Sequence, residues 1–293
     1  MELNKVYCMD NLELLKQLPN ESIDLIYCDI LYNTGKKFKD YDDNLGTAQE
    51  AIEWYKPRFI QMKRVLKDTG LLYIQCDSNL SHYIKVELDN IFGIKNFRNE
   101  IIWWYNSAPR KKKDFGKRHD TIFRYSKTDD YYFNENSEYI RQAYSPTAPR
   151  GYEKEKYYDS RGKIMDDVWK INMLGQNDKT ERVGYATQKP KELLYKIVDS
   201  SCPVGGIVAD FFCGSGTTLV AAKELGRNYI GCDIGEKAIE ITKDRLSKTV
   251  WDFWRIYMWR WEDVTYDSFN NFYNHIYCMV SMVYRISNIQ ETD

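Results

Sequence analysis

Apolar residues in the first hundred positions alternate between short continuous runs and helical spacing. The continuous runs predict strands, at residues 5–8, 23–28 and 71–76. Apolar residues three and four positions apart predict helices, at residues 11–17, 47–67 and 81–92. Asp10 is a suitable N-cap for the first helix, and residues 68–70 are a suitable stop before the third strand. Strands alternating with helices of this length are typical of βαβ units and a parallel sheet.

This pattern stops after residue 96 and returns near residue 188. The returning elements are helices and strands in alternation, at residues 188–200, 207–212, 217–225, 229–233 and 236–246. The segment between is rich in Lys, Arg, Tyr, Asn and Asp, and the last segment is rich in Trp, Tyr and Phe. The prediction is one α/β sheet with an insertion and an extension, divided as residues 1–97, 98–184, 185–248 and 249–293.

Composition narrows the class of protein only a little. The 293 residues carry a formal net charge of −1, so a nucleic-acid surface would have to be a local basic patch. Seven Cys are scattered without a CxxC pair and only three His are present, which predicts no metal site and reduced thiols in the cytoplasm. The chain has no apolar run near the ~20 residues that span a membrane, and no signal region at its N-terminus.

A Gly-rich turn between a strand and a helix is the strongest local signal. Gly214 and Gly216 let the backbone approach a ligand, but the phosphate-binding patterns are absent. Asp210 precedes the turn and suits a cationic group such as the amino or sulfonium end of S-adenosylmethionine. Asp233 ends the next strand and suits ribose hydroxyls. The alternative interpretation is a purely structural turn that caps the helix.

A second strand end carries the residues Asp29, Ile30 and Tyr32. The exocyclic amine of a base is a poor nucleophile because its lone pair is delocalised into the ring. The Asp29 carboxylate and the Ile30 carbonyl can accept hydrogen bonds from both N–H groups of such an amine, which favours a tetrahedral, reactive nitrogen. Tyr32 can stack on a base turned out of the double helix.

Together these residues resemble the β class of amino-methylating DNA methyltransferases of bacterial restriction–modification systems. Residues 184–190 (GYATQKP), 210–218 (DFFCGSGTT) and 227–233 (RNYIGCD) are similar to family motifs, and so is Asp10-Asn11. The acceptor motif precedes the cofactor motif, as in that class. The resemblance covers residues 3–248 and implies a circularly permuted, Rossmann-like fold that binds S-adenosylmethionine and double-stranded DNA. The residues it implies at the cofactor are Asp10, Asn11, Asp29, Thr187, Lys189, Asp210, Phe212, Gly214, Gly216, Thr217 and Asp233.

The chain departs from the family in its prolines. Ile30 and Leu31 stand where the acceptor motif has two prolines, and Phe211 replaces the proline after Asp210. Proline fixes φ, so the altered motif is expected to be less preorganised, and a slow or inactive DNA-binding homologue is one alternative. The acidic first residue of the motif favours adenine N6 over cytosine N4 as the methylated amine. Cytosine N4 methylation and methylation of RNA remain alternatives.

The middle segment is interpreted as the target recognition region. Its basic residues are interleaved with aromatic ones and are expected to contact DNA phosphates, among them Arg110, Lys111, Lys112, Lys113, Lys117, Arg118 and His119. A solvated basic face is the alternative. In the family pattern His119, Asp120 and Tyr125 border the target-base pocket, and base readout is expected between residues 135 and 182.

Three further features have weaker interpretations. Asp40, Asp42 and Asp43 are expected in a solvated loop after the acceptor motif, and ordering of this loop on DNA is the alternative. Cys213 is expected to be a packing residue and not a nucleophile, because no activating partner is evident. The aromatic extension is interpreted either as a homodimerisation element or as an extension without function, and the family resemblance raises a cognate restriction endonuclease as a partner.

Overall fold

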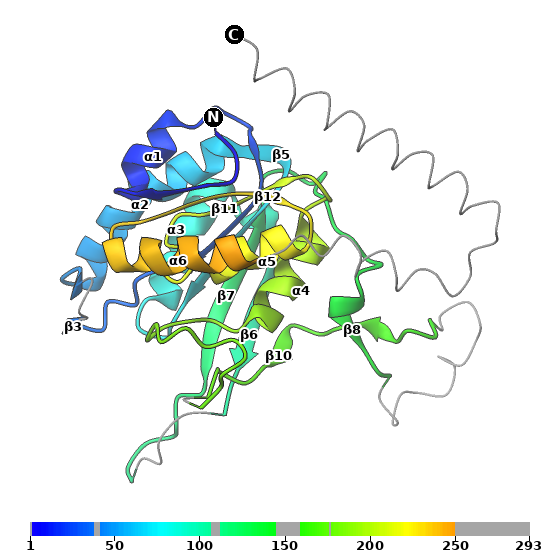
Figure 1. Ribbon diagram of the computed structural model, residues 1–293. Coiled ribbons are helices and arrows are strands. Elements are labelled where there is room, and N and C mark those ends of the chain that lie inside the picture. The colour runs from blue at the N-terminus through cyan, green and yellow to red at the C-terminus, as the bar shows by residue number, and fades with distance from the viewer. Residues whose placement is uncertain (1, 38–41, 107–111, 145–158, 176, 250–293) are drawn as a thin grey trace. The chain divides into compact units, whose positions relative to one another are not determined.

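The computed structural model describes residues 2–37, 42–106, 112–144, 159–175 and 177–249 (Figure 1). The aromatic extension from residue 250 onward lies outside the described residues, as do Arg110 and Lys111 of the basic run. The described elements of the first half begin with β1 (Lys5–Cys8), α1 (Asn11–Gln17), β2 (Ile23–Asp29), β3 (Lys36–Lys37), β4 (Asp42–Asp43), α2 (Ala48–Val65), β5 (Leu66–Cys76) and α3 (Ser81–Phe92).

The second half continues with β6 (Phe97–Trp104), β7 (His119–Ser126), β8 (Arg141–Gln142), β9 (Lys163–Ile164), β10 (Val168–Lys170), α4 (Lys191–Ser201), β11 (Ile207–Asp210), α5 (Thr217–Glu224), β12 (Asn228–Asp233) and α6 (Glu236–Lys248). In the described part of the chain eight strands form one sheet, in the order β1-β12-β11-β2-β5-β7-β6-β10. Only β7 runs antiparallel to its neighbours in that sheet.

Two apolar layers cover the sheet, as expected for a strand array buried on both faces. Along β2 the side chains alternate: Ile26 and Cys28 pack into the layer of α1, α2 and α3, and Leu25 and Tyr27 into the layer of α4, α5 and α6. Because both faces are covered, the strands read as continuous apolar runs, which is why the sequence predicted them well.

The middle segment, predicted as an insertion between two halves of one sheet, itself contributes strands to that sheet. β6, β7 and β10 lie in residues 98–184 or begin at their border, and they extend the sheet beyond β5. Trp103 is fully buried there, and its indole N–H donates to the carbonyl of Ile171 (2.8 Å). The charged residues placed between the apolar ones hid these strands. Arg124 is one of them: it is buried, and its guanidinium lies over the rings of Tyr131 and Phe133.

Element ends agree with the prediction apart from small shifts. The Asp10 carboxylate caps α1 by accepting from the backbone N–H groups of Leu12 and Glu13. The predicted stop at residues 68–70 lies inside β5, where the register against β2 shifts. The strand therefore begins at Leu66, five residues earlier than predicted. The residues of the predicted stop remain in the strand because the pairing with β2 is irregular there.

Candidate active site at the carboxyl edge of the sheet

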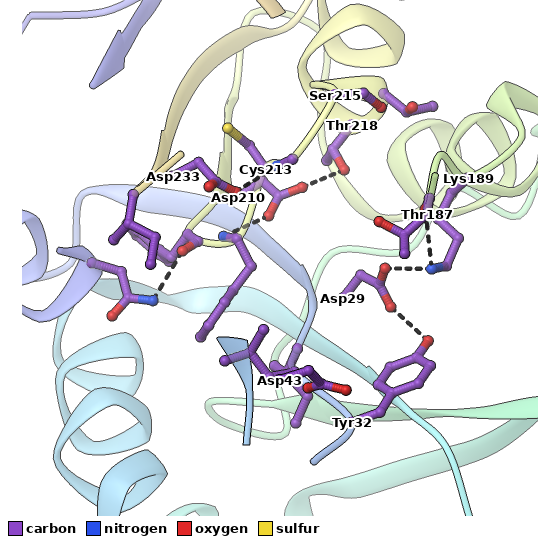
Figure 2. A pocket seen from close by; sticks show the side chains of 18 of the residues that line it. Asp29, Tyr32, Asp43, Thr187, Lys189, Asp210, Cys213, Ser215, Thr218 and Asp233 are labelled. Carbon is purple, nitrogen blue, oxygen red and sulfur yellow. Dashed lines mark hydrogen bonds and ion pairs between the residues drawn. The ribbon is translucent and has the colours of Figure 1, made fainter. Parts of the chain in front are cut away.

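Three acidic side chains meet at one edge of the sheet. Asp29, Asp210 and Asp233 end the adjacent parallel strands β2, β11 and β12, so all three lie at the carboxyl edge. They line one cavity of about 300 Å³, which is also lined by the acceptor loop and by the segment before α4 (Figure 2). In open α/β sheets ligands bind at this edge.

Asp210 is a buried carboxylate whose partners are all neutral. It is 2% exposed and accepts from the Thr218 hydroxyl (2.6 Å) and the Phe212 backbone N–H (3.0 Å). Burial raises the pKa of its carboxyl to about 7, while those two hydrogen bonds act in the opposite direction. Within the described residues no lysine or arginine forms an ion pair with Asp210. The site therefore suits a ligand that brings a positive charge.

The Gly-rich turn is shaped by close packing against α6. Gly216 has φ +74°, and a Cβ there would lie 2.4 Å from the Thr242 methyl group. Arg245 of α6 supports the same turn, donating to the Ser215 carbonyl (2.7 Å) and the Thr217 hydroxyl (2.9 Å). The turn needs glycine at 216 both for its left-handed backbone and for this contact.

Asp233 and the residues around α1 form the far wall of the cavity. Asp233 accepts from the backbone N–H groups of Gly214 and Gly235 (2.9 Å each). Asn11 donates to the Phe211 carbonyl (3.0 Å), and Arg58 donates to both Asn11 and Asp10. The Arg58 guanidinium carbon also lies 3.4 Å from the centroid of the Trp54 ring. Trp54 lines the cavity beside Phe212. Trp54 and Arg58 were not predicted as residues of the site, because helical spacing indicates only which face of the helix is buried.

The acceptor residues lie on the opposite side of the cavity. Asp29 accepts from the Tyr32 hydroxyl (2.7 Å) and forms an ion pair with Lys189 (Figure 2). Burial raises the pKa of the Asp29 carboxyl above its usual value, and the Lys189 ammonium is the largest influence that lowers it. Lys189 was expected at the cofactor and lines the same cavity, but its direct partner is the acceptor carboxylate.

Tyr32 is held between two carboxylates. Its hydroxyl lies 2.7 Å from Asp29 and 2.9 Å from Asp120 of β7. Asp120 also accepts from the Tyr105 hydroxyl and from Gln75 of β5 (2.9 Å each). Gln75 is fully buried within an apolar strand, a signal that the sequence analysis overlooked. The network joins the acceptor loop to β5, β6 and β7.

The basic residues of the predicted DNA surface are on the connection between β6 and β7, apart from His119, which is the first residue of β7. Lys112, Lys113, Lys117 and His119 are exposed, and Arg118 is half-buried with its guanidinium on Asn106 (2.7 Å). β6 runs parallel to β5, so this connection leaves the sheet at the same edge as Asp29. Basic side chains and the acceptor residues therefore share one edge of the molecule.

The described residues offer neither a membrane-spanning helix nor a metal-binding cluster. None of their helices has the length and apolar content that crossing a bilayer requires. They also contain no group of three or more His, Cys, Asp or Glu arranged to hold a metal ion.

A mostly parallel sheet with acidic strand ends, a Gly-rich turn and a buried carboxylate that lacks a cation defines the class of S-adenosylmethionine-dependent methyltransferases. Residues 23–244 match the model of the N6/N4 family, described as DNA methylase. The chain belongs to this family of DNA methyltransferases, and S-adenosylmethionine is its cofactor.

Individual relatives agree with this assignment. The chain is 33% identical over 246 residues to the type II methyltransferase M.HpaI of Haemophilus parainfluenzae, covering 83% of this chain and 74% of that protein. It is 31% identical over 251 residues to the DNA adenine methyltransferase YhdJ of Escherichia coli, covering 81% and 80%.

Solved structures support the fold. The PvuII cytosine-N4-specific DNA methyltransferase superposes with a TM-score of 0.64 at 17% identity, covering 94% of this chain and 93% of that one. The complex of M1.HpyAVI with S-adenosylmethionine gives 0.54 at 21% identity, covering 82% and 98%. The relatives thus include both adenine and cytosine enzymes.

Proposed function

We propose that the chain methylates the N6 amine of adenine in duplex DNA. The observation that carries this proposal is the single cavity in which Asp29 faces the residues of the Gly-rich turn. The acidic first residue of the acceptor motif supports adenine, and so does the adenine specificity in the name of YhdJ. Cytosine N4 is the second candidate, because the PvuII enzyme shares the fold.

In this proposal Asp29 and the Ile30 carbonyl accept hydrogen bonds from the two N–H groups of the target amine. Tyr32 donates one proton, so it gives up its contact with Asp29 when the amine binds there and turns its ring to the base. S-adenosylmethionine supplies an electrophilic methyl group on its sulfonium. Asp29 is suitably placed to take the proton that the amine loses, and the neighbouring Lys189 ammonium favours the ionised form of Asp29.

The cofactor residues divide by the chemistry they offer. Asp210 is proposed to face the positive charge of the cofactor, and Asp233 the ribose hydroxyls. The remaining expected residues line the same cavity or form its Gly-rich turn, and they are proposed to contact the rest of the cofactor: Asp10, Asn11, Thr187, Phe212, Gly214, Gly216 and Thr217.

Duplex DNA is proposed to lie along the connection between β6 and β7. The exposed amines of Lys112, Lys113 and Lys117 support this position, since they reach phosphates from the edge that carries Asp29. Homodimerisation through the aromatic extension and a cognate restriction endonuclease are further proposals. The first is tested by sedimentation of the full chain and of a chain ending at residue 249.

The methylated base is tested by identifying the product. Unmethylated duplex DNA of mixed sequence is incubated with the protein and isotopically labelled S-adenosylmethionine, digested to nucleosides and separated by mass spectrometry. We expect labelled N6-methyladenine. Labelled N4-methylcytosine would show that the target is cytosine N4, the second candidate. Label found only in RNA of matched sequence would show that DNA is not the substrate.

The raised pKa of Asp210 predicts pH-dependent cofactor binding. An acid with a pKa of about 7 is mostly protonated at pH 6 and mostly ionised at pH 8, and only the ionised form attracts a cationic ligand. We expect the dissociation constant for S-adenosylmethionine, measured by calorimetry, to fall by about tenfold between these pH values.

The matched variant is Asp210→Asn, which keeps the shape and removes the titration. Its affinity is expected to be weaker at both pH values, with a change between them of about twofold or less. An equal pH response in the parent protein and in Asp210→Asn would assign the effect to another group.

A further inference from the structure

The acceptor loop, residues 29–35, is held in place without the prolines of the family motif. The Ile30 N–H donates to the Gln75 carbonyl (3.1 Å), a hydrogen bond that proline cannot form. The Tyr55 hydroxyl donates to the Leu31 carbonyl (2.8 Å), and the Ile30 side chain is 3% exposed. These contacts fix the first half of the loop to β5 and α2.

One carboxylate, Asp43, bonds to the second half of the loop. It accepts from the backbone N–H groups of Asn33 and Thr34 (3.0 Å each) and from the Thr34 hydroxyl (2.5 Å). Asp43 is 4% exposed, which corrects the expectation that it lies in a solvated loop. For Asp40, and for the Asp42 side chain, that expectation lies outside what the structure describes.

The backbone at Asn33 needs this support. Its φ is +53°, in the left-handed region that is uncommon for non-glycine residues and that asparagine adopts more readily than most when its side chain is hydrogen-bonded locally. The Asn33 side chain accepts from the Leu45 N–H (2.7 Å) and donates to the Gly46 carbonyl (2.8 Å). The turn that follows Tyr32 is therefore tied to the segment around β4 from both sides.

The partners of the Asp43 carboxylate in the described structure all belong to the acceptor loop. Within the described residues no lysine or arginine forms an ion pair with it, and its oxygens face the N–H and O–H groups of Asn33 and Thr34. A carboxylate that accepts several such hydrogen bonds positions its donors more strongly than a neutral acceptor does. It also lines the cavity beside Asp29 and Tyr32 (Figure 2).

We propose that Asp43 is a positioning residue for methyl transfer. Its three hydrogen bonds set the course of the acceptor loop and so the placement of Asp29, the Ile30 carbonyl and Tyr32. Asp43 thereby restricts the backbone of the acceptor loop, as the two prolines of the motif do elsewhere in the family. This inference rests on the proposed function of the acceptor loop, and it explains how the chain keeps an ordered loop with Ile30 and Leu31.

The test compares Asp43→Ala and Asp43→Asn with Asn44→Ala in the full chain. Asn44 directly follows β4 and is exposed, and among the described residues its side chain has one hydrogen-bond partner, the Gly46 N–H, so it is the matched control. We expect Asp43→Ala to lower the rate of methyl transfer at saturating substrates by about 100-fold. Asp43→Asn, which keeps one acceptor oxygen, is expected to fall between Asp43→Ala and the parent. Asn44→Ala is expected to retain the parental rate.

Two further readouts separate positioning from a loss of structure. The dissociation constant for S-adenosylmethionine is expected to stay within about threefold of the parent in every variant. Adding Leu31→Pro to Asp43→Ala is expected to recover about tenfold in rate, because proline restores the restriction of the backbone. A parental rate in Asp43→Ala, or a loss of rate with no recovery by Leu31→Pro, overturns the proposal.

Amide hydrogen exchange tests the loop independently of the reaction. The Asn33 and Thr34 amides are expected to be protected in the parent and to exchange at least about tenfold faster in Asp43→Ala. If the parent methylates no substrate while this difference is present, the proposed function fails and the structural part of the inference stands. Equal exchange in both proteins overturns the inference whatever the activity.

Discussion

Replacing Asp29 with alanine is expected to lower the rate of methyl transfer to DNA by about 1000-fold or more. The side chain is the only carboxylate proposed to contact the target amine: a preorganised group of this kind contributes about 10²–10³, and loss of the proton acceptor adds to this. The cofactor is expected to bind with a dissociation constant within about threefold of the parent value, because Asp210 and Asp233 lie on other strands. Transfer is measured under conditions that saturate both substrates.

The variant Asp29→Asn separates charge from shape. Asparagine retains an oxygen for one N–H of the amine but loses the charge that pairs with Lys189, so its rate is expected to stay within about tenfold of Asp29→Ala. Turnover of Asp29→Ala at the parental rate would remove Asp29 from the reaction. Loss of cofactor binding together with the rate would show that Asp29 supports the cavity and not the amine.

Replacing Asp233 with alanine is expected to act on the cofactor and not on the amine. It removes the carboxylate proposed for the ribose and the hydrogen bond that orders the Gly214 N–H. The two ribose hydroxyls are proposed to donate to this carboxylate, and hydrogen bonds to charged groups are worth about 1.5–3 kcal/mol each, so the loss of both corresponds to an increase of about 100-fold or more in the dissociation constant. Calorimetry with S-adenosylmethionine gives this value directly.

Glu236→Ala is the matched control for Asp233. Glu236 is exposed at the start of α6, three residues further along the chain. Its removal is expected to leave the dissociation constant within about twofold of the parent. An unchanged affinity in Asp233→Ala would exclude its carboxylate from the cofactor site, whereas equal losses in both variants would indicate a general effect of negative charge at this edge.

The residues at the strand ends could be predicted because their chemistry is local. Asp29, Asp210 and Asp233 each follow a continuous apolar run, and the carboxyl ends of parallel strands meet at one edge. The helix caps and the Gly-rich turn are equally local signals. The fold class followed from the alternation of strands and helices, since a sheet covered on both faces leaves the same pattern along the chain.

Contacts between distant segments could not be predicted in this way. Asp43 lies in a polar stretch that is typical of a solvated loop, and only the fold brings it to Asn33 and Thr34. Gln75 and Asp120 meet Tyr32 from two strands whose pairing is antiparallel, a feature without a sequence signal here. The strands of the middle segment were missed for a related reason: charged residues such as Arg98 and Arg124 bond to side chains of the neighbouring strand, which the sequence does not show.

The most direct test of the account is transfer of a labelled methyl group from S-adenosylmethionine to unmethylated duplex DNA, with cofactor binding measured on the same preparation. The account predicts that label enters duplex DNA and that RNA of matched sequence stays unlabelled, despite Ile30 and Leu31 in the acceptor motif. Bound cofactor with no label in either nucleic acid would contradict it, and the chain would then be a DNA-binding homologue without methyltransferase activity.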